Sequence, residues 1–180
     1  LQDLADALAE FSDGDLEIMY GKPNSDTESS EARKQWDREL FFETIESSFD
    51  QEVVDIYRDF YEFGTTEADS VDYGTGKQTG SVQFYWNEYQ SGKYLVYEIR
   101  TDEVLQFRFW GRRDYDAALF EGFLEQINPL LDDPIEVEYL QSDEFNSLQV
   151  PIDRLRDDES REQVKKAIRD FIEYCASLVE

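Results

Sequence analysis

Residues 80–110 constrain the fold more than any other stretch, because they have the pattern of three consecutive β-strands. The strands expected are 81–87, 93–100 and 103–110, each alternating and rich in aromatic and β-branched residues. Gln90-Ser91-Gly92 and Thr101-Asp102 supply the turns between them. One face of this meander carries Val82, Phe84, Trp86, Leu95, Tyr97, Ile99, Leu105, Phe107 and Phe109. Such a face must be covered by other elements, so it is expected to form the centre of the core.

Helical and strand patterns flank the meander on both sides. Helices are expected over 31–48 with Ser30 as N-cap, over 51–63 ending at Gly64, over 114–128, and from Asp157 or Asp158 to about 178. Further strands are expected over 69–73, 135–140 and 147–150. This order predicts an α+β fold, in which an antiparallel sheet built on the three-stranded meander carries packed helices as a two-layer sandwich.

The N-terminal residues have a different character. Residues 1–11 have a helical stripe, and residues 1–20 are interpreted as a helical appendage or the tail of a preceding module. Residues 21–30 contain no large apolar side chain and are expected to be a linker. Residues 31–180 then form a single domain, and a start at Leu1 suggests a piece of a longer chain.

Charge is the dominant feature of the composition. The chain has 43 Asp and Glu residues against 17 Lys and Arg, a formal net charge of −26. The acids are spread between apolar positions along the whole chain, which indicates a halophilic surface: in molar salt the Debye length falls to about 3 Å and repulsion is screened. We therefore expect a salt-rich cytoplasm, such as that of a halophilic archaeon. A signal-peptide pattern and a membrane-spanning apolar run are both absent from the sequence, which favours a cytoplasmic protein without a membrane partner.

The residue inventory argues against several kinds of catalytic site. The sequence has no histidine, which excludes His-dependent triads and zinc sites of the Cys/His type. Its one cysteine, Cys175, lies on the apolar side of the last helix and is expected to be a buried, inert thiol. Acids are so frequent that a carboxylate pair at any spacing is expected by chance. No metal, cofactor or catalytic residue is therefore predicted.

One glycine-rich loop, 74–80, invites a nucleotide-binding interpretation. A P-loop requires Gly-x-x-x-x-Gly-Lys-Ser/Thr between a strand and a helix. Here Val71 and Gln78 break the motif and a strand follows, so we reject that interpretation. Lys77 remains a candidate for contacting an anion.

A degenerate nuclease core is the catalytic alternative. Asp72 and the Glu98-Ile99-Arg100 segment could stand for carboxylates that hold Mg²⁺ beside a water-orienting lysine. Arg100 is a poor substitute for that lysine because a guanidinium does not share its proton chemistry.

The second face of the meander is the most informative candidate surface. Residues 81–113 carry five Lys or Arg and four acids, so they are near neutral in a very acidic chain. The candidate binding residues are Lys77, Tyr85, Tyr94, Arg100, Arg108, Trp110, Arg112 and Arg113. Such an aromatic and Arg-rich island is where an anionic partner or nucleic acid could stack and pair at high salt. The alternative is that helices also cover this face and the arginines pair with nearby carboxylates.

A set of short patterns gives the chain a resemblance to a known group. The patterns are Trp36-x-x-x-Leu40, Gly76-Lys77-x-x-Gly80-Ser81, Val104-Leu105-Gln106-Phe107-x-Phe109-Trp110, Ile135-x-Val137-x-Tyr139, Pro151-Ile152 and the amphipathic segment 159–178. From about Arg33 onwards the chain thus resembles uncharacterised α/β domains of the DUF4268 kind, found alone or attached to restriction- and repair-type nucleases. The resemblance implies an accessory domain without catalytic residues of its own.

The sequence therefore favours a non-catalytic interaction or regulatory domain of a halophilic protein, an accessory module of a nucleic-acid-processing or defence system. The alternatives are a Mg²⁺-dependent nuclease or hydrolase fragment and a protein–protein scaffold. The partner is either a protein, including another domain of a parent chain, or nucleic acid at high salt.

Overall fold

A computed structural model describes residues 35–86, 94–109 and 117–177, all of which belong to one compact unit, Arg33–Glu180. The side chains of Tyr94 and Leu95 are outside this description. The expected appendage (1–20) and linker (21–30) also lie outside it.

Five antiparallel strands form one sheet in the order β1-β2-β3-β4-β5. They are β1 (Ser70–Tyr73), β2 (Ser81–Trp86), β3 (Tyr94–Arg100), β4 (Val104–Phe107) and β5 (Leu148–Pro151). The expected meander is therefore the middle of a larger sheet, and the strands expected over 69–73 and 147–150 are its two edges. The fold is α+β, as predicted.

The apolar face of the meander is the centre of the core. All of its described members are buried, and six of them expose no surface: Val82, Phe84, Tyr97, Ile99, Leu105 and Phe107. The rings of Phe84 and Tyr97 stack with their centroids 4.7 Å apart. Burial of each such side chain contributes about 1.5–3 kcal/mol, so this face carries much of the stability of the domain.

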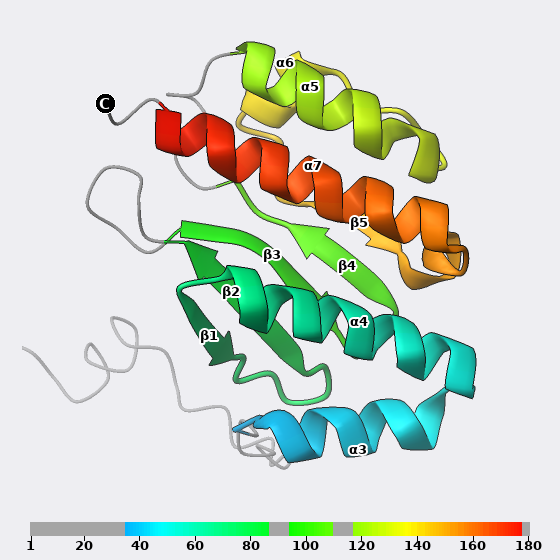
Figure 1. Cartoon of the computed structure of the whole chain (residues 1–180). Coiled ribbons are helices and arrows are strands. Elements are labelled where there is room, and N and C mark those ends of the chain that lie inside the picture. Colours follow the sequence, from blue (N-terminus) through cyan, green and yellow to red (C-terminus); the bar gives the residue numbers. More distant parts are fainter. Residues whose placement is uncertain (1–34, 87–93, 110–116, 178–180) are drawn as a thin grey trace, which may run out of the picture. The chain divides into compact units, whose positions relative to one another are not determined.

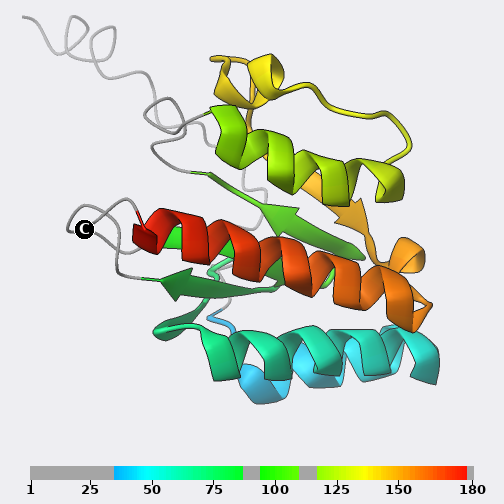
Figure 2. The ribbon, with the colours of Figure 1, turned by 45° about the horizontal axis from the view of Figure 1, so that its top comes forward.

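Three long helices lie on this face of the sheet: α4 (Gln51–Glu67), α5 (Ala117–Ile127) and α7 (Asp158–Ser177) (Figures 1 and 2). Aromatic contacts hold α4 and α5 to the sheet, as between Phe60 and Tyr97 and between Phe107 and Phe123. Asp59 of α4 accepts a hydrogen bond from Lys165 and forms an ion pair with Arg161, and both contacts connect α4 to α7. A fourth helix, α3 (Arg38–Ser48), packs on α4 through Phe41 and Tyr57. The remaining elements are η2 (Asn128–Leu130), α6 (Val137–Gln141) and η3 (Ile152–Leu155).

The first described helix begins later than the sequence pattern suggests. Asp37, not Ser30, is the N-cap of α3, and its carboxylate accepts a hydrogen bond from the backbone N–H of Leu40 at 2.9 Å. Trp36 lies before the helix, where it is buried against Gly80 and donates from Nε1 to the Gly76 carbonyl at 3.0 Å. The glycines of the 74–80 loop thus let an indole ring approach the backbone closely.

The prediction that the second helix ends at Gly64 is wrong. Helix α4 continues to Glu67. A Cβ atom at position 64 would lie closer than 3.0 Å to the Phe84 ring and to the Tyr97 hydroxyl. Glycine is therefore required here by close helix–sheet packing and not by a helix end.

The strand expected over 135–140 is also wrong, because Val137–Gln141 forms the short helix α6. The side chain of Asn128 donates to the Ile135 carbonyl at 3.0 Å and accepts from the Ile135 N–H at 2.9 Å. These bonds occupy the backbone groups that a strand would use for its ladder.

Tyr57 of α4 holds the turn between β3 and β4 through two hydrogen bonds. Its hydroxyl donates to the Arg100 carbonyl at 2.5 Å and accepts from the Glu103 N–H at 3.2 Å. Burial raises the pKa of Tyr57 well above its usual range, so the hydroxyl keeps its proton. Glu103 adopts a left-handed conformation with φ of 64°, which is unfavourable for a residue with a side chain.

Glu103→Gly is expected to stabilise the domain by about 0.5–1 kcal/mol, because relief of the left-handed strain exceeds the entropy that glycine adds to the unfolded chain. Chemical denaturation measures the change. Glu103→Ala is the control, since it removes the same carboxylate but keeps a Cβ, and it should give no gain. Equal stability of the two variants would show that φ at this position carries no cost.

No helix in the described ranges is both long enough and apolar enough to cross a bilayer.

Candidate functional site

A row of polar residues crosses all five strands on the face opposite the apolar core. The strand registers place Asp72 opposite Gln83, Gln83 opposite Glu98, Glu98 opposite Gln106, and Gln106 opposite Gln149. Directly opposed residues in antiparallel strands project on the same face. We call these five residues the polar row.

The polar row is exposed at its ends and buried in its middle. Asp72 and Gln149, on the edge strands, are exposed, whereas Glu98 is 1% and Gln106 2% exposed. Glu98 is the one buried Asp or Glu among the described residues. A buried carboxylate is costly unless it is paired, so its contacts decide what this face can do.

Glu98 is held on both oxygens. Gln83 donates from Nε2 to Oε2 at 2.9 Å, and Tyr85 in turn donates its hydroxyl to Gln83 Oε1 at 2.9 Å. The Arg108 guanidinium lies 3.1 Å from Oε1, and that of Arg100 lies 4.0 Å away. The negative charge is thus compensated by two arginines of the same face.

Arg100 links the polar row to the β3–β4 turn. It donates to Gln106 Oε1 at 2.9 Å and to both carboxylate oxygens of Asp102 at 2.9 and 2.6 Å. This two-pronged contact lowers the pKa of Asp102 and raises that of Arg100, so both stay charged. Because Asp102 is partly exposed, the contact serves mainly to orient the guanidinium.

Two atoms at the centre of the network lack a hydrogen bond. Glu98 Oε1 faces Arg108 at ion-pair distance but without hydrogen-bond alignment, and Arg108 Nε has no hydrogen-bond acceptor in the structure as described. Both atoms are buried. Buried polar atoms are nearly always satisfied, so these two atoms are the least well satisfied part of the network, and the Glu98–Arg108 ion pair is their compensation.

The candidate binding residues fall into three groups. Tyr85, Arg100 and Arg108 lie together around the polar row, although Tyr85 is only 8% exposed and points its hydroxyl at Gln83. Lys77 is exposed in the loop between β1 and β2. The side chain of Tyr94, and Trp110, Arg112 and Arg113, lie outside the described residues.

The two described arginines that were expected to receive an anion, Arg100 and Arg108, are therefore already paired. Arg108 is engaged by Glu98, and Arg100 by Asp102 and Gln106. Sequence reasoning identified the face but missed that Asp72 and Gln149 continue it across the edge strands. Their register depends on turns and bulges that a pattern of alternation does not fix.

The nuclease interpretation places its residues on this same face. Asp72 and Glu98 are two strands apart, with Gln83 between them, and Glu98 is occupied by Gln83 and Arg108. Within the described ranges, no group of three or more acidic or cysteine side chains is arranged to hold a metal ion. The contacts of Glu98 suit a network of hydrogen bonds better than a metal ligand.

Cys175 on α7 is buried, and burial raises the pKa of its thiol to about 11. Since the thiolate is the reactive form, we expect Cys175 to react with a thiol reagent at pH 7–8 at least about 100-fold slower than a free cysteine, and fully only after unfolding. Because the pKa of the thiol is higher in the folded than in the unfolded chain, the fold is favoured while Cys175 is protonated. This contribution to stability is complete below the ordinary pKa of 9 and is lost as the pH rises towards 11. Rapid labelling of the native protein would contradict the buried position.

No protein-family model matches the chain, nor does any curated protein or solved structure.

Proposed function

We propose that the chain is a non-catalytic interaction domain that binds a protein partner through the polar row. The observation that carries the proposal is the polar row itself, which crosses all five strands and is exposed at both ends, with an internally compensated Glu98 at its centre. In an antiparallel sheet one face commonly packs on the apolar core, while the polar residues that alternate with it face water or a partner. This supports a two-layer arrangement with helices on the apolar face.

A protein partner suits this face better than nucleic acid. Its two described arginines are matched by Glu98 and Asp102. Nucleic-acid binding depends on uncompensated Lys and Arg that displace counterions from phosphates. What the polar row presents instead, at its exposed ends, is a carboxylate and an amide side chain. An accessory role in a nucleic-acid-processing or defence system is compatible with this proposal when the polar row contacts a protein component of that system.

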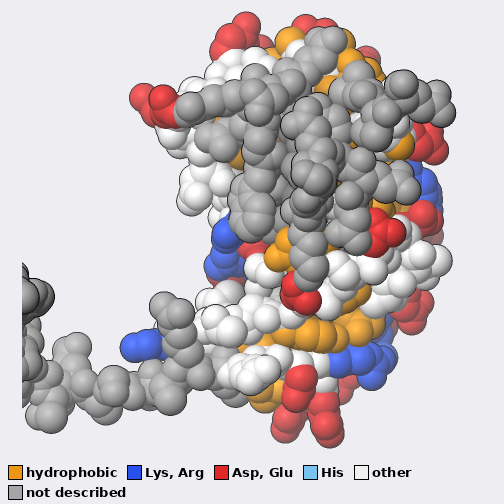
Figure 3. All heavy atoms as spheres, turned by 90° about the vertical axis from the view of Figure 1, so that its left-hand side faces the viewer, with side chains coloured by type: hydrophobic (Ala, Val, Ile, Leu, Met, Phe, Trp, Pro, Cys, Tyr) orange, Lys and Arg blue, Asp and Glu red, His pale blue; other side chains and the backbone are white. Residues whose placement is uncertain are grey.

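The same proposal includes a high-salt cytoplasm as the working environment. Apart from Glu98, the described acids avoid full burial. In Figure 3 they occupy several separate places on the surface, with Lys and Arg side chains between some of them. A dispersed acidic surface of this kind needs counterions to limit self-repulsion.

Site-specific photocrosslinking tests the proposal. A photoreactive amino acid is placed at Asp72 or Gln149, the exposed ends of the polar row, and the protein is irradiated in a salt-matched extract of its source cells. We expect protease-sensitive adducts of one partner from both positions. The matched control is Glu125, an exposed position on α5.

Adducts at Glu125 equal to those at the polar row would refute a specific surface. Adducts that a nuclease removes would show that the partner is nucleic acid and not protein. Divalent-ion-dependent cleavage of an oligonucleotide that Glu98→Gln abolishes would revive the nuclease alternative.

A further inference from the structure

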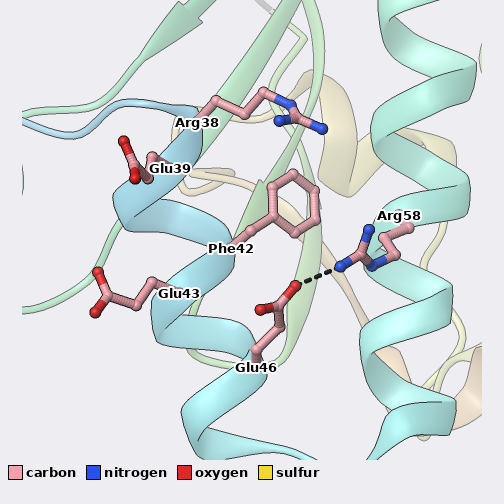
Figure 4. A pocket seen from close by; sticks show the side chains of 6 residues that line it. All are labelled: Arg38, Glu39, Phe42, Glu43, Glu46 and Arg58. Carbon is pink, nitrogen blue, oxygen red and sulfur yellow. Dashed lines mark hydrogen bonds and ion pairs between the residues drawn. The ribbon is translucent and has the colours of Figure 1, made fainter.

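A cleft between α3 and α4 lies apart from the polar row. It has a volume of about 520 Å³ and is lined by Arg38, Glu39, Phe42, Glu43, Glu46 and Arg58. This volume is in the range of small-ligand sites. Figure 4 shows Arg38 of α3 and Arg58 of α4 both beside the Phe42 ring, with Arg58 directed at Glu46.

Both guanidiniums rest on the same aromatic ring. The Cζ atoms of Arg38 and Arg58 lie 5.6 and 5.5 Å from the Phe42 ring centroid, and Arg38 is also 5.6 Å from the Tyr61 centroid. These distances fall within cation–π range. The Phe42 ring therefore positions two positive groups beside one space, and the N–H groups of Arg38 are not used by an ion pair.

Only one of the three acids that line the cleft pairs with an arginine. Glu46 pairs with Arg58, whereas Glu39 and Glu43 extend from the opposite side of α3, away from Arg58 (Figure 4). Arg38 is thus left without an ion-pair partner among the acids of the cleft.

Arg38 is unusual among the bases of this acidic domain. Every other Lys and Arg of the described residues except Lys77 takes part in an ion pair. Arg38 makes no ion pair or hydrogen bond in that part of the chain, although acids surround it in the sequence. A planar guanidinium with free N–H groups is suited to two-pronged contact with a carboxylate.

We propose that the α3–α4 cleft binds a carboxylate group, with Arg38 as its principal contact and Arg58 as the second. The carboxylate comes either from a small organic acid or from an acidic side chain of a partner protein. This site is independent of the polar row, and neither site requires the other.

The test is a titration of the arginine side-chain N–H signals by NMR at constant ionic strength, with potassium acetate replacing potassium chloride. We expect saturable shifts of the Arg38 and Arg58 signals. A short glutamate-rich peptide forms the second arm. Peptide binding at least about tenfold tighter than acetate, a difference of about 1.4 kcal/mol, identifies a protein source, and equal binding per carboxylate identifies a free acid.

Three variants give the proposal its controls. Arg38→Gln should weaken binding about tenfold or more, because a charge-assisted hydrogen bond is lost. Glu46→Gln should tighten binding up to about fivefold, because it releases Arg58 from a surface ion pair. Lys77→Gln removes the other described base that lacks an ion pair and should leave binding unchanged. Non-saturable shifts, or shifts that persist in Arg38→Gln, would overturn the proposal.

Discussion

Alanine at position 64 is expected to lower the free energy of unfolding by about 3 kcal/mol, because its methyl group overpacks a fully occupied helix–sheet interface. The added carbon would meet the Phe84 ring and the Tyr97 hydroxyl, and that hydroxyl donates to the Phe60 carbonyl at 2.8 Å. Displacing it would leave a buried donor and acceptor unpaired. For a chain of this size the melting temperature should fall by about 6–12 °C.

Gly122→Ala is the matched control. Gly122 also lies inside a helix, α5, but a Cβ atom there would meet nothing within 4 Å. Higher helix propensity should then stabilise the domain by about 0.5–1 kcal/mol. The same substitution is thus expected to lower the free energy of unfolding at position 64 and to raise it at position 122. If both stabilised the protein, the close approach of α4 to Phe84 and Tyr97 would be wrong.

Salt concentration is expected to have a comparably large effect on the stability of the domain. Between 0.1 and 1 M KCl the Debye length shortens from about 10 to 3 Å, which suppresses repulsion among distant surface charges. With a net charge of −26, we expect a gain of about 4 kcal/mol and a rise of about 8–16 °C in melting temperature. Thermal denaturation by circular dichroism across this range measures it.

Some ion pairs, such as those of Asp59 with Lys165 and Arg161, will weaken in the same titration. Their contribution is small beside the total repulsion because most of these pairs are partly exposed. An uncharged osmolyte at equal osmolarity separates charge screening from general exclusion effects. A melting temperature that stays flat or falls with KCl would contradict the halophilic interpretation.

The core could be predicted from sequence because its signal is local. Alternation along the meander, with large aromatics at every second position, identified the buried face, and the described members of that face are all buried. The caps Asp37 and Asp50 are local signals too, but the predicted N-cap of the first helix was Ser30, and Asp37 caps it in the structure.

The errors arose where a distant contact decides the local structure. Gly64 signals a helix end by propensity, yet Phe84 and Tyr97 explain its presence inside α4. Ile135 begins an alternating segment, yet Asn128 takes its backbone hydrogen bonds. The polar row and the α3–α4 cleft likewise depend on strand register and helix packing, which no single segment encodes.

The most direct test of the central claim compares capture of the crosslinked partner by two double variants. Gln83→Ala with Gln149→Ala removes two members of the polar row, and Glu121→Ala with Glu125→Ala removes two exposed side chains of α5. At equal melting temperature, we predict at least a tenfold loss of affinity for the first and none for the second, as expected when interfacial hydrogen-bonding groups are deleted. Equal affinities would show that the row merely stabilises the sheet.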